Sequence, residues 1–225
     1  MRIGALSFLL LGIGARSAIA QSNIDPGHKF AWTENAGWTN WYDANNAQDG
    51  VFIHPTFLEG FIWAENVGWI NVGDGSPANG VHYANKDGSD FGGNLDPNIF
   101  ELFGLAWGEN VGWLNFEGGA LANPPQPARL DGCRLRGYAW GENIGWLNLD
   151  DAEHYIRVAT SAKRGDLNCD CVINNFDIDP FVLALTNPTK YAQQFPNCDR
   201  MLADCNGDGK VNNFDIDPFV KLLAP

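Results

Sequence analysis

One nine-residue motif occurs four times between residues 32 and 148, and it restricts the fold more than any other feature of the chain. The copies begin at Trp32, Trp63, Trp107 and Trp140 and follow the pattern Trp-x-Glu-Asn-x-Gly-Trp-x-Asn. Eight of the nine tryptophans lie in these copies. A unit that recurs in this way must bury its apolar surface against its neighbours, so the copies should form one repeat domain.

Each copy is typical of a β-hairpin. The Glu-Asn-x-Gly segment suits a type I turn that closes on a glycine in the left-handed conformation. An aromatic residue or leucine stands two positions before the first Trp, and most residues one and three positions after the second Trp are apolar. Helical periodicity is absent from this repeat region. The pattern therefore predicts an all-β repeat domain of tandem hairpins with a sandwich- or solenoid-like arrangement.

Period-two alternation predicts two faces for each hairpin. We expect the first Trp to point into the core and the second to lie on the opposite face beside an asparagine. A flat indole suits a pyranose ring, and amides suit its hydroxyls, so this opposite face is a candidate ligand face. It comprises Trp38, Trp69, Trp113, Trp146, Asn40, Asn71, Asn115 and Asn148. A purely architectural role for the same residues, between neighbouring repeats and in turns, is the alternative.

A glutamate recurs in every copy, at Glu34, Glu65, Glu109 and Glu142. Two carboxylates are the usual machinery of a glycosidase. All four glutamates occupy the same place in their own turn, however, and nothing in the sequence marks a unique pair. Motifs for a serine triad, a zinc protease or a phosphate loop are also missing from the sequence. The repeats therefore favour a non-catalytic domain, no catalytic residue is assigned, and a polysaccharide-degrading enzyme remains the alternative.

A second duplication occupies the C-terminal quarter of the chain. Segments 166–177 and 204–215 place oxygen-bearing side chains at loop positions 1, 3, 5, 9 and 12, and both run on into Ile-Asp-Pro-Phe-Val. Ca²⁺ takes six to eight oxygen ligands, and a 12-residue EF-hand loop supplies them at this spacing. Position 12 is Asp instead of Glu, and position 6 is Gly209 in one loop but Cys171 in the other. The duplication predicts two calcium sites, with a solvated acidic turn as the alternative.

The segment from Gly165 to Leu223 resembles the dockerin family, in which two such loops are each followed by one helix. The resemblance implies that the module binds two Ca²⁺ ions and inserts into a cohesin-like partner, often joining secreted polysaccharide-degrading enzymes to a scaffold. The implied ligands of the first ion are Asp166, Asn168, Asp170, Asn174, Asp177 and the carbonyl of Val172. Those of the second are Asp204, Asn206, Asp208, Asn212, Asp215 and the carbonyl of Lys210. The implied partner contacts are Asn175, Phe176, Asn213 and Phe214.

The N-terminal residues are typical of a secretory signal peptide. Met1-Arg2 precedes an apolar run over residues 3–13, and Ala18-Ile19-Ala20 suits cleavage after Ala20. The apolar run is too short to span a membrane, and no later stretch reaches that length. We therefore expect a secreted, soluble mature protein. The Trp repeats resemble those of bacterial secreted proteins, which implies the same location and a β architecture. A net charge of −13 argues against nucleic acid and anionic membranes as partners.

Five cysteines in a secreted chain favour disulfide bonds. Four of them cluster in the calcium module, where three pairings are possible. We favour Cys169–Cys198 together with Cys171–Cys205. Cys133 is then left over, either as a buried small apolar residue or as an intermolecular link.

These features predict four segments: a signal peptide over 1–20, the all-β domain over 21–160, a linker over 161–164 and the α-helical dockerin-like module over 165–225. The predicted function is that of a secreted, non-catalytic protein. Its calcium-dependent module would attach a Trp-rich β domain, with carbohydrate or another polymer as candidate ligand, to an extracellular assembly linked to polysaccharide breakdown. A dockerin-borne glycoside hydrolase and a purely structural cell-envelope protein are the alternatives.

Overall fold

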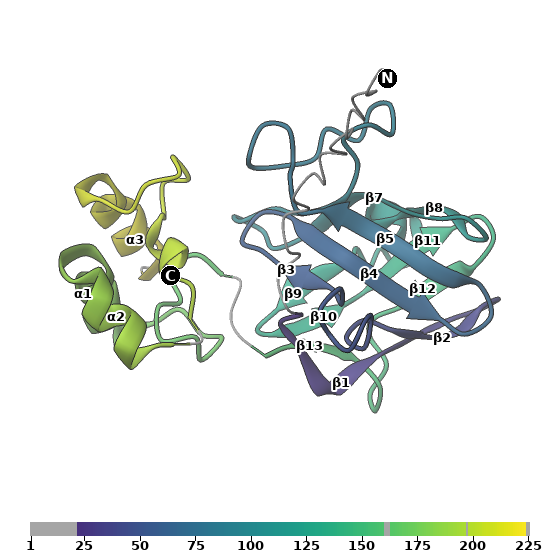
Figure 1. Cartoon of the computed structure of the whole chain (residues 1–225), viewed down its shortest axis with the longest axis horizontal. Coiled ribbons are helices and arrows are strands. Elements are labelled where there is room, and N and C mark those ends of the chain that lie inside the picture. The colour runs from purple at the N-terminus through teal and green to yellow at the C-terminus, as the bar shows by residue number, and fades with distance from the viewer. Residues whose placement is uncertain (1–21, 160–162, 197, 224–225) are drawn as a thin grey trace, which may run out of the picture.

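The computed structural model describes residues 22–159, 163–196 and 198–223, which form a β domain and a smaller helical module (Figure 1). The expected signal peptide with its cleavage site after Ala20, and part of the expected linker, lie outside the described residues. No helix in the described part of the chain is long and apolar enough to cross a membrane.

The β domain has thirteen strands in its described residues, most of them short. They are β1 (Ile24–Thr33), β2 (Gly37–Asn40), β3 (Phe52–Ile53), β4 (Leu58–Ala64), β5 (Gly68–Asp74), β6 (Gly93–Leu95), β7 (Leu102–Gly108), β8 (Gly112–Asn115), β9 (Arg129–Asp131), β10 (Arg134–Arg136), β11 (Tyr138–Gly141), β12 (Gly145–Asn148) and β13 (Ile156–Val158). A short 3-10 helix, Phe116–Leu121, follows β8.

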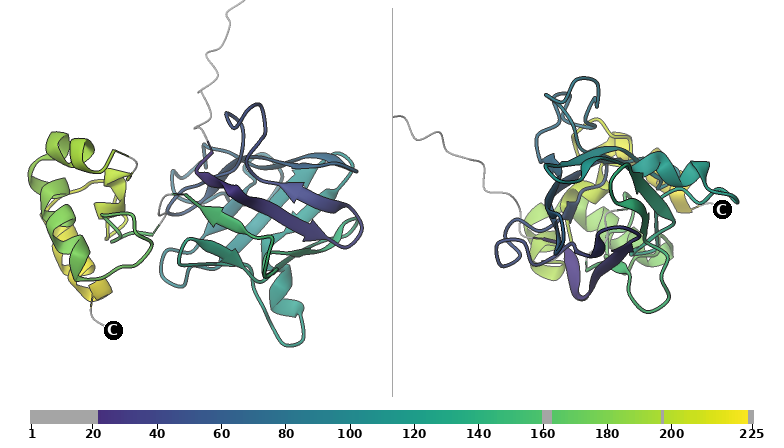
Figure 2. Two further views of the ribbon diagram at one scale, coloured as in Figure 1. Left: turned by 90° about the horizontal axis from the view of Figure 1, so that it is seen from below. Right: turned by 90° about the vertical axis from the view of Figure 1, so that its right-hand side faces the viewer.

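Eight of these strands form a closed antiparallel barrel. The four motif copies make the hairpins β1–β2, β4–β5, β7–β8 and β11–β12, and each hairpin pairs with the next. Strand β12 then pairs back with β1, where Trp32 lies opposite Asn148. The barrel is seen from two further directions in Figure 2. The all-β class is confirmed, but a sandwich- or solenoid-like arrangement is wrong. Closure lets the first and last hairpins pair with each other, so neither leaves an open edge.

The predicted left-handed glycine at the end of the turn is confirmed in all four hairpins. Gly37, Gly68, Gly112 and Gly145 have φ angles of 76°, 87°, 72° and 67°. In each hairpin the residue before the Glu lies opposite this glycine, so three residues separate the paired strand ends. A left-handed backbone is strained for most residues but not for glycine, which explains the fixed Gly of the motif.

The two tryptophans of each motif copy lie directly opposite one another across the hairpin. Opposite residues of an antiparallel pair point to the same face, and here that face is the outer surface of the barrel. The prediction that the first Trp points into the core is therefore wrong. The expected alternation placed the first Trp on the same face as the residue after the second Trp, but the two tryptophans pair with each other. The register of the hairpin therefore differs by one residue from the expected one, and a one-residue shift moves every side chain of a strand to the opposite face.

The barrel interior is filled by the residue before the first Trp and the residue after the second. These opposed, buried pairs are Ala31–Thr39, Ile62–Ile70, Ala106–Leu114 and Ala139–Leu147. An eight-stranded barrel has room for little more than such side chains. The one buried tryptophan is Trp41, outside the motif, with 0% exposure. Its Nε1 donates a hydrogen bond to Thr39 Oγ1 at 3.2 Å.

The helical module contains α1 (Ile178–Thr186), α2 (Pro188–Gln194) and α3 (Ile216–Leu223), with one helix directly after each acidic loop. Single 3-10 turns, 175–177 and 213–215, connect the loops to α1 and α3. Helices α1 and α3 pack against each other through Phe181 and Phe219, whose stacked rings have centroids 4.0 Å apart. The module therefore has its own small core, separate from that of the barrel.

A disulfide between Cys133 and Cys171 joins the two units. It connects the turn between β9 and β10 to position 6 of the first acidic loop. The predicted Cys169–Cys198 bond is confirmed, whereas Cys171–Cys205 is wrong. Cys171 packs against the barrel core and therefore faces Cys133. Cys205 is free, and burial raises the pKa of its thiol to about 12.

We expect the double substitution Cys133→Ser and Cys171→Ser to lower the free energy of unfolding of the helical module by about 2–4 kcal/mol. The bond joins two cysteines that are 38 residues apart in sequence, and it restricts the conformations of the unfolded chain. Without the bond the unfolded chain gains conformational entropy, which favours unfolding. Urea unfolding followed by helical circular dichroism at fixed calcium measures the effect. Cys205→Ser is the matched control and should change stability by under about 1 kcal/mol. Equal stabilities for the double variant and the wild type would contradict the assigned link.

Candidate functional site

The first acidic loop is held in shape by its own carboxylates. Asp166 accepts a hydrogen bond on Oδ2 from the backbone N–H of Cys171 at 2.8 Å. Asp177 accepts on Oδ1 from the N–H of Leu167 at 2.8 Å and on Oδ2 from the N–H of Asn174 at 2.8 Å. The carboxylates at loop positions 1 and 12 therefore accept from backbone N–H groups at positions 2, 6 and 9, and the position-12 carboxylate connects the two ends of the loop.

The second loop repeats the bonds from positions 6 and 9, and its position-12 carboxylate accepts from position 3, as Asp177 also does from the N–H of Asn168 at 3.2 Å. Asp204 accepts on Oδ2 from the N–H of Gly209 at 2.9 Å. Asp215 accepts on Oδ1 from the N–H of Asn206 at 3.1 Å and on Oδ2 from the N–H of Asn212 at 2.8 Å. The two copies thus share one conformation as well as one sequence pattern.

The four end carboxylates, Asp166, Asp177, Asp204 and Asp215, are all buried. Burial raises the pKa of Asp177 above its usual value, and the backbone N–H groups of Asn174, Asn168 and Leu167 offset part of that rise. Removing an ionised carboxylate from water is unfavourable unless a positive charge or hydrogen bonds compensate. A cation beside these groups would favour their charged form.

The remaining predicted ligands lie in the same two loops. Asn168 and Asp170, at positions 3 and 5, are adjacent, with Asn168 Nδ2 donating to Asp170 Oδ2 at 2.9 Å. Asn174 accepts from the N–H of Phe176 at 2.7 Å and thereby begins the helical turn. No group of three or more His, Cys, Asp or Glu in the described residues is arranged to hold a metal by itself. The available donors are a mixed set of carboxylate, amide and backbone oxygens, which suits a hard cation such as Ca²⁺.

Position 6 of the two loops shows why glycine is usual there. Cys171 and Gly209 have φ angles of 76° and 80°, both left-handed. The non-glycine residue carries a strain of roughly 1–2 kcal/mol. In the first loop the disulfide to Cys133 holds Cys171 in place.

The predicted partner contacts include the two most exposed aromatic side chains of the helical module. Phe176 and Phe214 are 77% and 79% exposed, and they occupy position 11 of their loops. Val182 and Val220 on the following helices are exposed as well. Each copy therefore presents an equivalent apolar patch, and exposed apolar groups of this kind mark interaction surfaces.

On the barrel, the asparagine of each Glu-Asn-x-Gly turn has an architectural role. Asn66, Asn110 and Asn143 each donate from Nδ2 to a backbone carbonyl in the turn of the preceding hairpin, at 3.0–3.1 Å. The backbone N–H of Asn35 closes the ring by donating to Ile144 at 3.1 Å. Glu34 Oε2 accepts from the N–H of Trp146 at 3.1 Å. These bonds lock the four turns together at one end of the barrel.

The asparagine two positions after the second Trp ends its strand in β2, β8 and β12, whereas β5 continues past Asn71 to Asp74. The Oδ1 atoms of Asn71, Asn115 and Asn148 each accept from the N–H two residues later, at 2.8–2.9 Å, and Asn40 does so at 3.0 Å. Such turns are common for asparagine. Four of the predicted ligand-face residues, Asn40, Asn71, Asn115 and Asn148, therefore use their carbonyl oxygens within the fold. The local spacing of the motif could have indicated this role.

The tryptophans of the predicted ligand face do lie on the outer surface. Trp38, Trp69 and Trp113 are exposed, and Trp146 is half-buried. The motif glutamates occupy four separate turns, and Glu65, Glu109 and Glu142 are exposed to solvent.

The chain was compared with protein-family models, curated proteins and solved structures. No match was found in any of the three. The function must therefore be inferred from the residues of the chain itself.

Proposed function

We propose that the chain is a secreted, non-catalytic attachment protein. Its segment 165–225 acts as a dockerin-like module that binds two Ca²⁺ ions and docks on a cohesin-like partner. The module thereby attaches the Trp-rich barrel, as a polysaccharide-contacting domain, to an extracellular assembly linked to polysaccharide breakdown. The observation that carries this proposal is the duplicated loop, in which buried carboxylates at positions 1 and 12 make equivalent hydrogen bonds in both copies.

The donor chemistry supports calcium in both loops. Side-chain oxygens at positions 1, 3, 5, 9 and 12, with the carbonyls of Val172 and Lys210 at position 7, give each loop the ligand set of an EF-hand-type site. A bound Ca²⁺ would neutralise clustered negative charge and fix the orientation of the helix that follows. The shorter Asp at position 12 would approach the ion from the start of that helix.

The exposed phenylalanines support docking. Phe176 and Phe214 contribute large apolar surfaces next to loops whose conformation the metal would set. Burial of aromatic side chains at the centre of an interface commonly supplies much of the binding free energy. Docking should therefore depend on calcium, because the loops position both side chains.

We expect immobilised full-length protein to capture a cohesin-like partner from the secreted proteins of its own host in calcium, and to lose it in chelator. Mass spectrometry identifies the captured protein. The double substitution Phe176→Ala and Phe214→Ala should weaken purified-partner binding by roughly 100-fold or more, since each aromatic anchor contributes about 2 kcal/mol.

Leu121→Ala is the matched control, because Leu121 is an equally exposed apolar residue on the barrel. It should leave partner binding unchanged. Capture that is equally strong in calcium and in chelator would count against the docking role.

A further inference from the structure

The four second tryptophans of the motif occupy equivalent positions but have different surroundings. Trp38 contacts His154, with ring centroids 4.7 Å apart, and Trp113 contacts Phe91 at 5.4 Å. His154 and Phe91 each lie outside the hairpin of the tryptophan that they contact. Among the described residues, Trp69 has ring contacts only with Phe61 and Trp63 of its own hairpin, and Trp146 only with Tyr138 of its own hairpin. Trp69 is the most exposed motif tryptophan, at 49%, whereas Trp146 is half-buried.

Two hollows in the barrel surface meet at Trp69. The first has a volume of about 350 Å³ and the second about 420 Å³, and Phe61 and Trp69 line both. A third hollow of about 160 Å³ shares Asn71 with the second. We call these three adjoining hollows the Trp69 groove. Its length along the surface suits a chain-like ligand better than a compact one.

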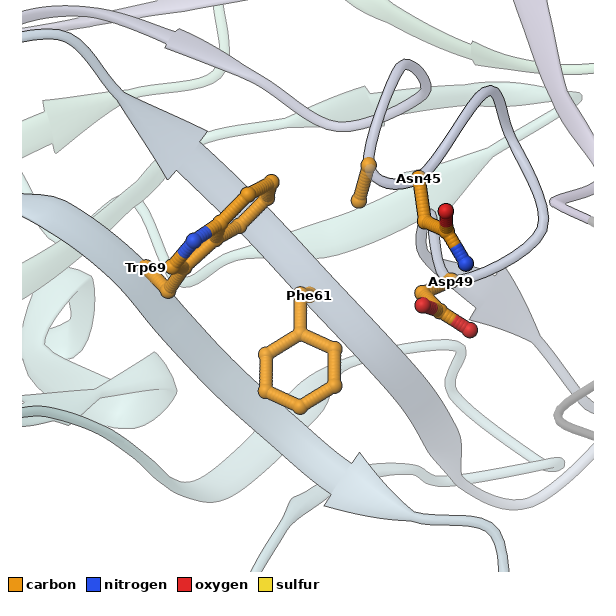
Figure 3. Close-up of a pocket in the computed structure, with 5 residues that line it drawn as sticks. Asn45, Asp49, Phe61 and Trp69 are labelled. Atoms are coloured by element: carbon orange, nitrogen blue, oxygen red, sulfur yellow. The ribbon is translucent and has the colours of Figure 1, made fainter.

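A preformed loop makes the far wall of the first hollow. Asn45 and Asp49 lie on this loop and line the hollow together with Phe61 and Trp69, which lie on the neighbouring strands β4 and β5 (Figure 3). Asn45, Asn46 and Ala47 are all left-handed, with φ angles of 48°, 56° and 67°. The N–H of Asp49 donates to Ala44 at 3.1 Å. Consecutive left-handed residues are rare outside functional sites, and the fixed loop reduces the entropic cost of binding.

The groove is acidic. Asp49 lines the first hollow and Glu109 the second, and within the described residues neither side chain has a hydrogen-bond or ion-pair partner. Asp74 and Asp90 line the third hollow. Neither lysine nor arginine is among the lining residues of the three hollows. The groove therefore offers hydrogen-bond acceptors to an incoming ligand and repels anions.

We propose that the Trp69 groove binds a linear polysaccharide built from uncharged pyranose units. The apolar C–H face of a sugar ring packs on the exposed indole of Trp69, with Phe61 and Trp107 contacting the neighbouring units. Asp49 and Glu109 accept hydrogen bonds from sugar hydroxyls on either side of Trp69. Uronate and sulfated chains are repelled by the acidic lining. This inference deepens the proposed polysaccharide contact of the barrel and restricts it to the second and third of the four motif copies.

Affinity gel electrophoresis and calorimetry on the full-length protein, with mixed-linkage β-glucan and galactomannan as uncharged probes, test the proposal. Polygalacturonate and alginate serve as acidic probes. The wild type should bind at least one uncharged probe and neither acidic one. Trp69→Ala should weaken that binding by roughly tenfold or more, as loss of a central aromatic contact does. Trp38→Ala, at the equivalent motif position and with ring partners that line none of the three hollows, should change it less than about twofold.

The double substitution Asp49→Asn and Glu109→Gln provides a second test that does not remove an aromatic ring. It should weaken binding by roughly tenfold while leaving the melting temperature unchanged, because neither side chain bonds within the fold. Equal loss in Trp69→Ala and Trp38→Ala would overturn the proposal. So would binding to no uncharged probe, or preferential binding of a lysine-rich peptide. Chelation should not affect polysaccharide binding, so failure here is distinguishable from failure of calcium-dependent docking.

Discussion

Replacing Trp41 with alanine is expected to lower the free energy of unfolding of the barrel by about 3–5 kcal/mol. The indole is fully buried, and its truncation would leave a cavity that the paired strands cannot fill by relaxing. The hydrogen bond from its Nε1 to Thr39 Oγ1 would be lost as well. Urea unfolding followed by tryptophan fluorescence measures the change, since all nine tryptophans lie between residues 32 and 146 of the barrel.

Trp107→Ala is the matched comparison for Trp41→Ala. Trp107 lies on the outer surface and contacts Trp113, with ring centroids 4.7 Å apart. The substitution should lower the free energy of unfolding by only about 1–2 kcal/mol, because it removes one aromatic pair and the burial of a partly exposed ring. If Trp107→Ala proved as destabilising as Trp41→Ala, the assignment of the motif tryptophans to the outer face would be wrong.

Removal of calcium is expected to destabilise the helical module by about 5 kcal/mol. Each bound ion contributes roughly 2.7 kcal/mol at a hundredfold excess over its Kd, and the sequence offers two sites. For a unit of this size, chelation should lower the melting temperature by more than about 10 °C. Circular dichroism at the helical band follows the module, because its described residues contain all of the α-helices.

Tryptophan fluorescence gives the internal control for chelation. The barrel contains no part of the two loops, so its fluorescence transition should move by less than about 2 °C when calcium is removed. A larger shift of the fluorescence transition would indicate that the Cys133–Cys171 bond transmits part of the destabilisation of the helical module to the barrel. Equal shifts in both signals would indicate that chelation acts on the whole chain and not on the loops.

Local features of the fold could be predicted from the sequence. The hairpin turns follow from Glu-Asn-x-Gly because a left-handed position selects glycine, as at Gly68 and Gly112. The conformation of the acidic loops follows equally from their own Asp and Asn residues, which bond to backbone N–H groups within the same loop. Interactions among residues close in sequence determine both features, and periodicity reports such interactions directly.

Features that depend on pairing between distant segments could not be predicted. Closure of the barrel requires β12 to pair with β1, and no local pattern specifies that contact. Whether a motif tryptophan points into the core or outward depends on the pairing register of its hairpin, and a shift of one residue reverses the direction. In the structure Trp107 pairs with Trp113, and both lie on the outer face. The Cys133–Cys171 bond joins two units whose mutual position is not encoded in the spacing of cysteines. The Trp69 groove likewise arises from two loops, three strands and an unequal covering of the four repeats.

A calorimetric calcium titration of the full-length protein tests whether each acidic loop binds one Ca²⁺ ion. This assignment predicts two bound ions for the wild type, one for Asp177→Ala, one for Asp215→Ala and none for the double variant, because each substitution removes the position-12 ligand of one loop. Absence of calcium binding by the wild type, or two ions still bound by the double variant, would contradict it.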